Sequence, residues 1–426
     1  MVKPILLNVG KASRLLAVQT DRFKSEMLSA QFYRPTLRET AQLNTLLPAV
    51  LRRGTARFPS KQALSRYLDD LYSTTIAMRN RRLGDMQNIG FAADFLGARY
   101  VGGEGLLAKV IDTMAELLLA PAFENGALRT DFVESEKANL QDAIKASIND
   151  PRALAAAKCR ALLCRDEPFA LPLHGTVEAA REITASQLTA RYRAFLEEAG
   201  PVFFYVGASD PEAVAEKLSE AFEDLTNSAP QYQTVLAPAG ELCRAQKDAP
   251  LCQGKLAIGL RTEVAMGHRL APALMLFNEL YGGSPASKLF LNVREKRGLC
   301  YHCSSSLDLY KGVILASAGM IPENREITEE AMLAELAALK AGRISEEELA
   351  AARSSLDHSY RQLADNPAAL CDFYGGRMLA GCYETVEEWR ERLARVTLAE
   401  ILEVGETIDA GAIFFLNGTL EGEDEE

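Results

Sequence analysis

The sequence carries the same succession of features twice, in segments that begin about 210 residues apart. The first, TVEAAREITASQLTARYRAFLEEAGPVFFYVGAS, begins at Thr176, and the second, TVEEWRERLARVTLAEILEVGETIDAGAIFFLNGT, begins at Thr385. Each predicts two helices, a glycine-containing break and an aromatic strand, VFFYVG or IFFLNG. Matched segments at one offset indicate an internal repeat, so we expect a fold built from two similar halves.

Two Asx-Pro dipeptides upstream of these segments extend the repeat. EKANLQDAIKASINDP, from Glu136, and AARSSLDHSYRQLADNP, from Ala351, both predict a long helix that ends before the proline, because the residue before proline avoids the helical region. Between the halves lies the polar, proline-containing stretch NSAPQYQTVLAPAG. We therefore expect an N-terminal half at residues 1–226, a linker at 227–240 and a C-terminal half at 241–426.

Within each half, strands are mixed with long helices. In the second half, QGKLAIGLRTE predicts a strand, HRLAPALMLFNELYGG a helix that glycine ends, and LCYHCSSSLDLYKGVILASAGM two strands joined by a turn at residues 308–312. Ser345 and Glu348 form a capping box that opens a helix through about Leu363. Meandering strands with long helices predict an α+β fold of two tandem α/β halves rather than doubly wound sheets.

Charge and hydropathy limit the partners and the cellular compartment that we expect for the chain. Its formal net charge is −11, which argues against a nucleic-acid partner, because phosphate binding requires a basic surface. The longest apolar runs, such as AELLLAPAF from Ala115, are too short to cross a bilayer, and the N-terminal segment lacks a sustained apolar core and a cleavage site. We therefore expect a cytoplasmic protein with no membrane segment.

The eight cysteines and four histidines do not indicate a metal site. Only CYHC, Cys300 to Cys303, has a suggestive spacing, and residues three apart on a strand point to opposite faces. No second cysteine pair follows to complete a zinc site, so these cysteines are expected to be reduced strand residues. The histidines lie in different predicted elements and are expected to be surface or hydrogen-bonded residues: His174, His268, His302 and His358.

The stretch GGSPASKLFLNVREKRGLCYHCSSSLDLYKG, residues 282–312, resembles the second-half signature of the pitrilysin (insulinase) family of zinc metallopeptidases. The repeat length, the Asx-Pro breaks and RRGTARFPS, from Arg52, also match, so the resemblance covers nearly the whole chain. It implies two tandem halves of the pitrilysin and mitochondrial processing peptidase type.

In that family the catalytic helix carries an HxxEH motif about ten residues before the Gly-Thr pair that stands here at Gly54 and Thr55. Its two histidines, one helical turn apart, bind one zinc ion, and the glutamate acts as general base. The resemblance places the motif on TLLPA, so Thr45 and Ala49 replace the histidines and Pro48 replaces the glutamate. Pro48 is also expected to kink or break the helix, because it lacks a backbone N–H.

The family's third zinc ligand is a glutamate on a later helix, and the resemblance places it at Ala143. All three ligands and the base are then absent, because neither alanine nor threonine provides a suitable zinc ligand. We expect no zinc or other cofactor in this chain, and zinc only in a partner chain.

Arg294 and Tyr301 have the R-x6-Y spacing with which family members bind substrate from the half opposite the zinc. A guanidinium and a phenol can donate hydrogen bonds to a peptide carbonyl and to the oxyanion that forms on it. In an unrelated fold, the same residues would be an arginine on a loop and a tyrosine on a half-buried strand.

The resemblance leaves two functional interpretations. In the first, the chain is the inactive subunit of a two-chain zinc peptidase, a heterodimer in which an HxxEH-bearing homologue supplies the metal while Arg294 and Tyr301 bind the peptide substrate. In the second, it is a structural or binding protein on a peptidase scaffold, with no role in proteolysis. A homodimer is possible, and an active stand-alone peptidase is disfavoured by the missing ligands.

Overall fold

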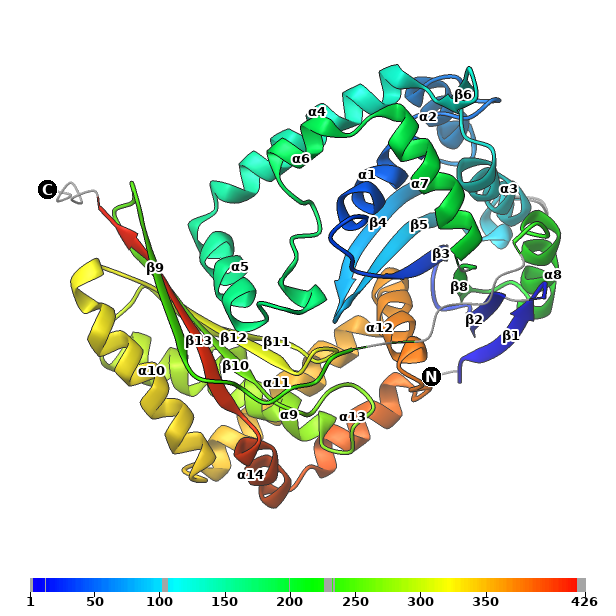
Figure 1. Cartoon of the computed structure of the whole chain (residues 1–426). Helices are drawn as coiled ribbons and strands as arrows, with labels where there is room; N and C mark the ends of the chain where they lie inside the picture. The colour runs from blue at the N-terminus through cyan, green and yellow to red at the C-terminus, as the bar shows by residue number, and fades with distance from the viewer. Residues whose placement is uncertain are drawn as a thin grey trace, which may run out of the picture. The chain divides into compact units, whose positions relative to one another are not determined.

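The computed structural model describes residues 3–11, 13–101, 106–198, 200–225, 232 and 234–419. The chain divides into two compact units, each with one main β-sheet and helices packed on it (Figure 1). The first unit comprises Met1–Lys145, Pro172–Gln233 and Leu363–Thr385. The second comprises Ala146–Leu171, Thr234–Gln362 and Val386–Glu426.

The first unit contains a six-stranded sheet with the strand order β1-β2-β8-β3-β5-β4. Its strands are β1 Ile5–Val9, β2 Ser13–Gln19, β3 Ser25–Pro35, β4 Thr75–Leu83, β5 Met86–Leu96 and β8 Val202–Gly207. Neighbouring strands are antiparallel except β2 and β8, which are parallel. β8 lies inside the sheet, and every residue of its VFFYVG run is buried, as in a strand covered on both faces.

Helices cover both faces of this sheet. On one face, α1 Ala41–Leu51, α3 Leu106–Leu119 and α8 Pro211–Ala221 share an apolar core with Phe32, Phe91 and Phe203 of the strands. On the other face, α12 Pro367–Leu379 packs over β3 and β8. The remaining elements are α2 Lys61–Asp70, α4 Thr130–Ile148, α6 Val177–Glu182, α7 Ala185–Glu198 and the short pair β6 Phe123–Glu124 and β7 Ala127–Leu128.

The second unit contains a five-stranded sheet with the order β11-β12-β10-β13-β9. Its strands are β9 Cys243–Ala249, β10 Gly254–Arg261, β11 His302–Asp308, β12 Val313–Met320 and β13 Asp409–Gly418. Only β13 and β9 are parallel. The predicted pair of strands joined by a turn at residues 308–312 is confirmed as β11 and β12.

Helices also cover both faces of the second sheet. α5 Pro151–Leu163 packs over β10 and β13 on one face. α9 Ala271–Asn278, which continues into the π-helical turn η3 Glu279–Gly283, and α10 Arg325–Lys340 lie on the other. The remaining helices are the π-helical segment η4 Leu289–Lys296, α11 Glu346–Leu363, α13 Val386–Arg395, α14 Leu398–Glu406 and the 3-10 helices η2 Pro168–Ala170 and η5 Pro322–Asn324. The capping box predicted for α11 is confirmed, because Ser345 and Glu348 exchange side-chain-to-backbone hydrogen bonds.

The two sheets repeat one strand arrangement. β2-β8-β3-β5-β4 of the first matches β9-β13-β10-β12-β11 of the second in order and direction. In each, the aromatic strand is parallel to one neighbour, β2 or β9, and antiparallel to the other, β3 or β10. The predicted equivalence of the VFFYVG and IFFLNG strands, β8 and β13, is therefore confirmed, and the fold is α+β with tandem halves.

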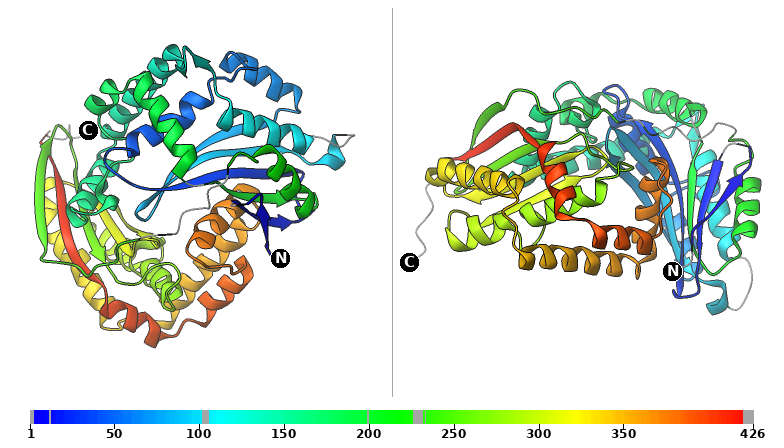
Figure 2. Two further views of the ribbon diagram at one scale, coloured as in Figure 1. Left: turned by 45° about the vertical axis from the view of Figure 1, so that its right-hand side comes forward. Right: turned by 90° about the horizontal axis from the view of Figure 1, so that it is seen from below.

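One helix from each half of the sequence belongs to the other compact unit. α5 precedes the predicted linker but packs on β10 and β13, whereas α12 follows it but packs on β3 and β8, the equivalent strands. Both views in Figure 2 show α12, in orange, beside the blue strands of the first sheet. The compact units therefore cross the ranges predicted for the two halves, and residues 227–231 and 233 of the predicted linker at 227–240 lie outside the described residues.

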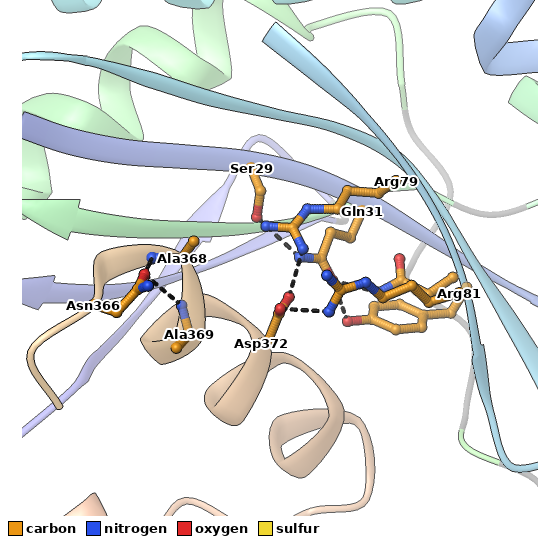
Figure 3. Close-up of polar contacts among 10 residues, drawn as sticks. Ser29, Gln31, Arg79, Arg81, Asn366, Ala368, Ala369 and Asp372 are labelled. Atoms are coloured by element: carbon orange, nitrogen blue, oxygen red, sulfur yellow. Dashed lines mark hydrogen bonds and ion pairs between the residues drawn. The ribbon is translucent and has the colours of Figure 1, made fainter. Parts of the chain in front are cut away.

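The Asx-Pro dipeptides mark the start of these exchanged helices. α4 ends at Ile148 and α11 at Leu363, as predicted from the prolines that follow. Each Asx side chain then caps a new helix: Asp150 accepts the N–H groups of Arg152 and Ala153, and Asn366 those of Ala368 and Ala369 (Figure 3). Proline suits the first turn that follows, because its missing N–H would have no helical partner there.

A carboxylate on α12 binds two arginines of β4. The Asp372 carboxylate accepts from Arg79 Nη1 at 2.8 Å and from Arg81 Nη1 at 2.5 Å (Figure 3). Arg79 is buried, and its side chain is 10% exposed. Breaking this pair would leave the Arg79 charge without its carboxylate in a nearly dry position, so the pair fixes α12 on its host sheet.

The segment after α5 carries an equivalent anchor. Glu167 accepts from both terminal nitrogens of Arg261, on β10, at 2.5 and 3.0 Å. Its carboxylate also lies 2.6 Å from Nζ of Lys311, in the turn between β11 and β12, and the Lys311 side chain is completely buried. The α5 segment and α12 thus each contribute one carboxylate that pairs with two cations of the sequence half on whose sheet they pack.

Candidate functional site

Thr45, at a position expected for a zinc-binding histidine, lies on α1 and is 9% exposed. Its hydroxyl oxygen accepts hydrogen bonds from Asn80 Nδ2 of β4 and Gln87 Nε2 of β5, both at 3.0 Å. The same oxygen lies 2.7 Å from the carbonyl oxygen of Leu173 and 3.0 Å from that of Ala41. Thr45 is therefore the centre of a buried hydrogen-bond network, and its hydroxyl is fully used.

The amide groups of this network were missed by sequence reasoning. Gln87 is fully buried, and it also donates to the Ala41 carbonyl and to Asn80 Oδ1 while accepting from Asn44 Nδ2. Asn44 Oδ1 in turn accepts from Arg191 Nε at 2.7 Å. The sequence carried no clear signal for these partners, because Asn44, Asn80 and Gln87 lie in three different elements that only the fold brings together.

Pro48 does not break the helix, so that part of the expectation is wrong. α1 runs from Ala41 to Leu51 with Pro48 inside it, and the Pro48 carbonyl accepts from the N–H of Arg52 at 3.1 Å. Proline still removes one helical hydrogen bond, the one to the carbonyl of Asn44. The helix persists because most of its side chains are buried in the apolar core, and packing contributes more to a short helix than any one hydrogen bond.

The other two positions of the expected zinc site also carry no ligand. Ala49 is half-buried on α1, one turn after Thr45, and Ala143 is exposed on α4. A partly buried carboxylate of α4 is Glu136, two turns before Ala143, and its Oε1 lies 2.6 Å from Nε of Arg53, which follows α1. An arginine therefore neutralises this carboxylate.

No group of three or more His, Cys, Asp or Glu side chains that could hold a metal ion occurs in the described part of the chain. The prediction for the histidines is confirmed. His174 is exposed, and the rings of the other three are hydrogen-bonded: His268 to the N–H of Leu270, His302 to Ser304, and His358 to Gln362.

Arg294 and Tyr301 both lie in the second unit, on either side of a turn that leads into β11. Arg294 is on η4, its side chain is 39% exposed, and its guanidinium lies 4.5 Å from the Phe290 ring centroid and 3.4 Å from Glu295 Oε1. Tyr301 is 62% exposed, and its N–H donates to the carbonyl of Gly319 at 2.8 Å. The backbone of Tyr301 is thus fixed to the sheet while its ring stays accessible.

Cys300 and Cys303, on either side of Tyr301, are both buried. Cys300 precedes β11 and does not follow the alternation of the strand that contains Cys303. The hydrogen bond from Cys303, together with the nearby charge of Arg294, lowers the pKa of the Cys300 thiol, while burial opposes the change. The same hydrogen bond, followed by burial, raises the pKa of Cys303.

None of the described helices is long and apolar enough to cross a membrane.

Residues 182–356 match the family model described as the Peptidase M16 inactive domain. The chain is 28% identical over 406 residues to the "Probable inactive metalloprotease YmfF" of Bacillus subtilis, covering 94% of this chain and 95% of the relative. It is also 25% identical to an uncharacterized zinc protease of Mycobacterium leprae, covering 69% of this chain and 68% of that protein.

Solved structures show the same fold. A conserved protein from Enterococcus faecalis V583 superposes with a TM-score of 0.88 at 27% identity, covering 99% of this chain and all of that one. The absence of HxxEH at Thr45 to Ala49 agrees with the name of the Bacillus subtilis relative, a probable inactive metalloprotease. The chain is therefore similar over nearly its whole length to a probable inactive metalloprotease, its central part matches the Peptidase M16 inactive domain, and it lacks the HxxEH motif.

Proposed function

We propose that this chain is the non-catalytic, peptide-binding subunit of a two-chain zinc peptidase. The proposal depends on a contrast between two parts of the family's catalytic apparatus. The hydroxyl of Thr45 is buried and hydrogen-bonded to Asn80 and Gln87, whereas the side chains of Arg294 and Tyr301 are exposed. The metal-binding part has become structural, and the substrate-binding part keeps its donors.

Chemistry explains why such a chain requires a partner. A guanidinium and a phenol can stabilise the oxyanion of a peptide carbonyl, but a nucleophilic water must attack that carbonyl. Zinc and the general base would come from an HxxEH-bearing homologue, which makes a heterodimer the proposed assembly. The cytoplasm is the proposed compartment, because cysteines scattered through a long chain are typical of reduced thiols in a reducing environment.

A structural or binding protein with no role in proteolysis is the second candidate. The observation that favours it is local: Arg294 stacks over Phe290 and pairs with Glu295, so it already has structural partners. Exposed cation–π contacts and ion pairs contribute little stability, roughly 0–1 kcal/mol each, so they give a weak reason to keep this arginine.

The chain is proposed to hold no zinc of its own at Thr45, Ala49 and Ala143. Metal analysis of tag-free protein should therefore find less than one zinc per chain after dialysis against a weak chelator. One tightly held zinc per chain, lost when Thr45 and its neighbours are substituted, would contradict the proposal.

Copurification from the native cell tests the assembly. The chain should retain a homologue that carries HxxEH, identified by mass spectrometry, in a complex of one copy each. Recovery of a homodimer alone, from cells that express the zinc-bearing homologue, would favour the second candidate.

A further inference from the structure

A polar hollow lies beside α5 on the second sheet. Its volume is about 270 Å³, and it is lined by Asp150 and Arg152 at the start of α5, Ser306 of β11, and Leu315 and Ser317 of β12. β11 is an edge strand that pairs with β12, so the hollow lies towards the outer edge of the sheet. Among the described residues, it is a concave site that neither the family's metal positions nor the Arg294–Tyr301 pair occupies.

Hydrogen-bond donors gather at this hollow. His302, Ser304 and Ser306 are alternate residues of β11, so their side chains share one face of the sheet. Arg152 Nη2 donates to Ser304 Oγ at 3.1 Å, and Nε2 of His302 lies 3.1 Å from Ser304 Oγ. Ser317 Oγ lies 3.5 Å from the same His302 nitrogen. We call these five residues the polar shelf: Arg152, His302, Ser304, Ser306 and Ser317.

The shelf carries positive charge that carboxylates compensate only in part. Lys255 of β10 lies in one row with His302, because both pair with Gly319 of β12. Burial, followed by the charges of Arg152, Arg294 and Lys255, lowers the pKa of His302. Burial and Arg152 also lower the pKa of Lys255, while Asp150 opposes this change. The cations therefore repel one another across the shelf.

Two carboxylates face these cations. Asp150 uses Oδ1 to accept the N–H groups of Arg152 and Ala153 as the cap of α5, and Glu295 pairs with Arg294. Arg152 donates to the hydroxyl of Ser304, and Lys255 Nζ donates to Gln253 Oε1 at 2.8 Å, so both cations bind neutral oxygens. A bound anion would relieve the repulsion among the cations and accept hydrogen bonds from the serine hydroxyls.

We propose that the polar shelf binds a carboxylate group of the peptide substrate. This inference rests on the proposed peptide-binding function. A planar guanidinium matches a carboxylate better than it matches a neutral amide, and the hydroxyls supply further donors. The hollow has room for one side chain or chain end, and the net charge of −11 disfavours a polyanion such as nucleic acid. The carboxylate is either an acidic side chain or the C-terminus.

Four matched fluorescent peptides separate these two sources. They combine an internal Glu or Gln with a free or amidated C-terminus, and their binding to the full chain is measured by fluorescence anisotropy. The forms that carry the recognised carboxylate should bind about tenfold more tightly than the Gln, amidated form, as expected for hydrogen bonds to a charged group. Equal binding of all four forms would overturn the proposal and leave the peptide-binding function intact.

Variants test whether the cations at the polar shelf cause the preference for a carboxylate. Arg152→Gln and Lys255→Gln should each remove most of the preference for the carboxylate, and Lys247→Gln, an exposed charge on β9 of the same sheet, should keep it. Circular dichroism checks folding, and Lys255→Gln carries the test if Arg152→Gln does not fold. An unchanged preference in a folded Lys255→Gln or Arg152→Gln variant would also overturn the proposal.

The two proposals fail in different ways. Arg294→Ala and Tyr301→Phe should weaken all four peptides alike, because they act on the peptide backbone. Failure of every form to bind would overturn both the carboxylate site and the proposed function.

Discussion

Thr45 stands where the sequence resemblance predicts a zinc-binding histidine, and its hydroxyl joins α1 to both strands of a hairpin, through Asn80 of β4 and Gln87 of β5. A metal site and this network have different requirements. The metal needs ligand lone pairs that stay free for the ion, whereas the network uses those lone pairs for amide donors. The hydrogen bonds of Thr45 therefore predict a role in stability.

Thr45→Ala should lower the free energy of unfolding by about 1–3 kcal/mol, because the half-buried amide of Asn80 loses its Thr45 acceptor and the Leu173 carbonyl loses its hydroxyl partner. Chemical denaturation followed by circular dichroism measures the change. Thr45→Ser keeps the hydroxyl and is the matched control, with a clearly smaller loss. Equal stability of Thr45→Ala and wild type would mean that the network does not contribute.

The sequence could predict what Thr45, Ala49 and Ala143 lack but not what Thr45 does. The absence of ligands is a property of the side chains themselves. The partners of Thr45 lie 42 residues away at Gln87 and 128 residues away at Leu173, and only the tertiary fold brings them together.

Among the secondary structure elements, the exchanged helices α5 and α12 determine the composition of the compact units. α5 comes close to its host sheet: a Cβ atom on Gly259 of β10 would lie 3.0 Å from Leu163, and one on Gly411 of β13 would lie 2.8 Å from it. The Asx-Pro dipeptides predicted where α4 and α11 end, because that effect is local. They could not predict which sheet the next helix covers, because a proline restricts local backbone angles and does not determine tertiary contacts.

Glu167→Gln should release the α5 segment from its anchor. At pH 7 we expect a loss of about 3–5 kcal/mol in the free energy of unfolding, because the buried Lys311 and Arg261 would lose their shared carboxylate. Burial acts to raise the pKa of Glu167, but hydrogen bonds and charge from Arg261 and Lys311 outweigh it and lower the pKa below the usual 4.5. The stabilisation is therefore complete above about pH 4.5 and is lost as the pH falls through the folded-state pKa.

The measurement is denaturation of wild type and Glu167→Gln at several pH values. The difference between the two should shrink below pH 4.5. Asp142→Asn is the control, because its carboxylate is 77% exposed and pairs with Lys145 at 3.4 Å on the surface, where ion pairs contribute little. A pH-independent difference for Glu167→Gln would assign its effect to packing and not to charge.

For the whole molecule, the helix exchange makes the two halves of the sequence depend on each other. Without α12, the face of β3 and β8 that carries Tyr33 and Phe204 would lose its cover, since both side chains lie against Gly375 of α12. The repeat was predictable from sequence because each half has its own copy of the aromatic strand and its flanking helices. The exchange was not, because it changes contacts without changing the order of elements.

Expression of residues 1–226 alone should therefore give insoluble or non-cooperatively unfolding protein, although this range matches one sequence repeat. Coexpression with residues 227–426 should restore a soluble complex, because each fragment supplies the helix that the other lacks. Soluble expression and thermal unfolding provide the measurement. A cooperative unfolding transition for residues 1–226 alone, at the temperature of the full chain, would show that α12 is dispensable.

The central claim is that a chain without zinc ligands contributes to peptide cleavage through Arg294 and Tyr301. The most direct test reconstitutes the chain with an HxxEH-bearing homologue and measures turnover of a fluorogenic peptide. The chain alone should be inactive, and the mixture should be active. Arg294→Ala and Tyr301→Phe should each lower turnover by the mixture, by about 2–4 kcal/mol in transition-state stabilisation if their donors act as an oxyanion hole does, while size-exclusion chromatography shows unchanged assembly. Full turnover by both variants in intact complexes would contradict the account.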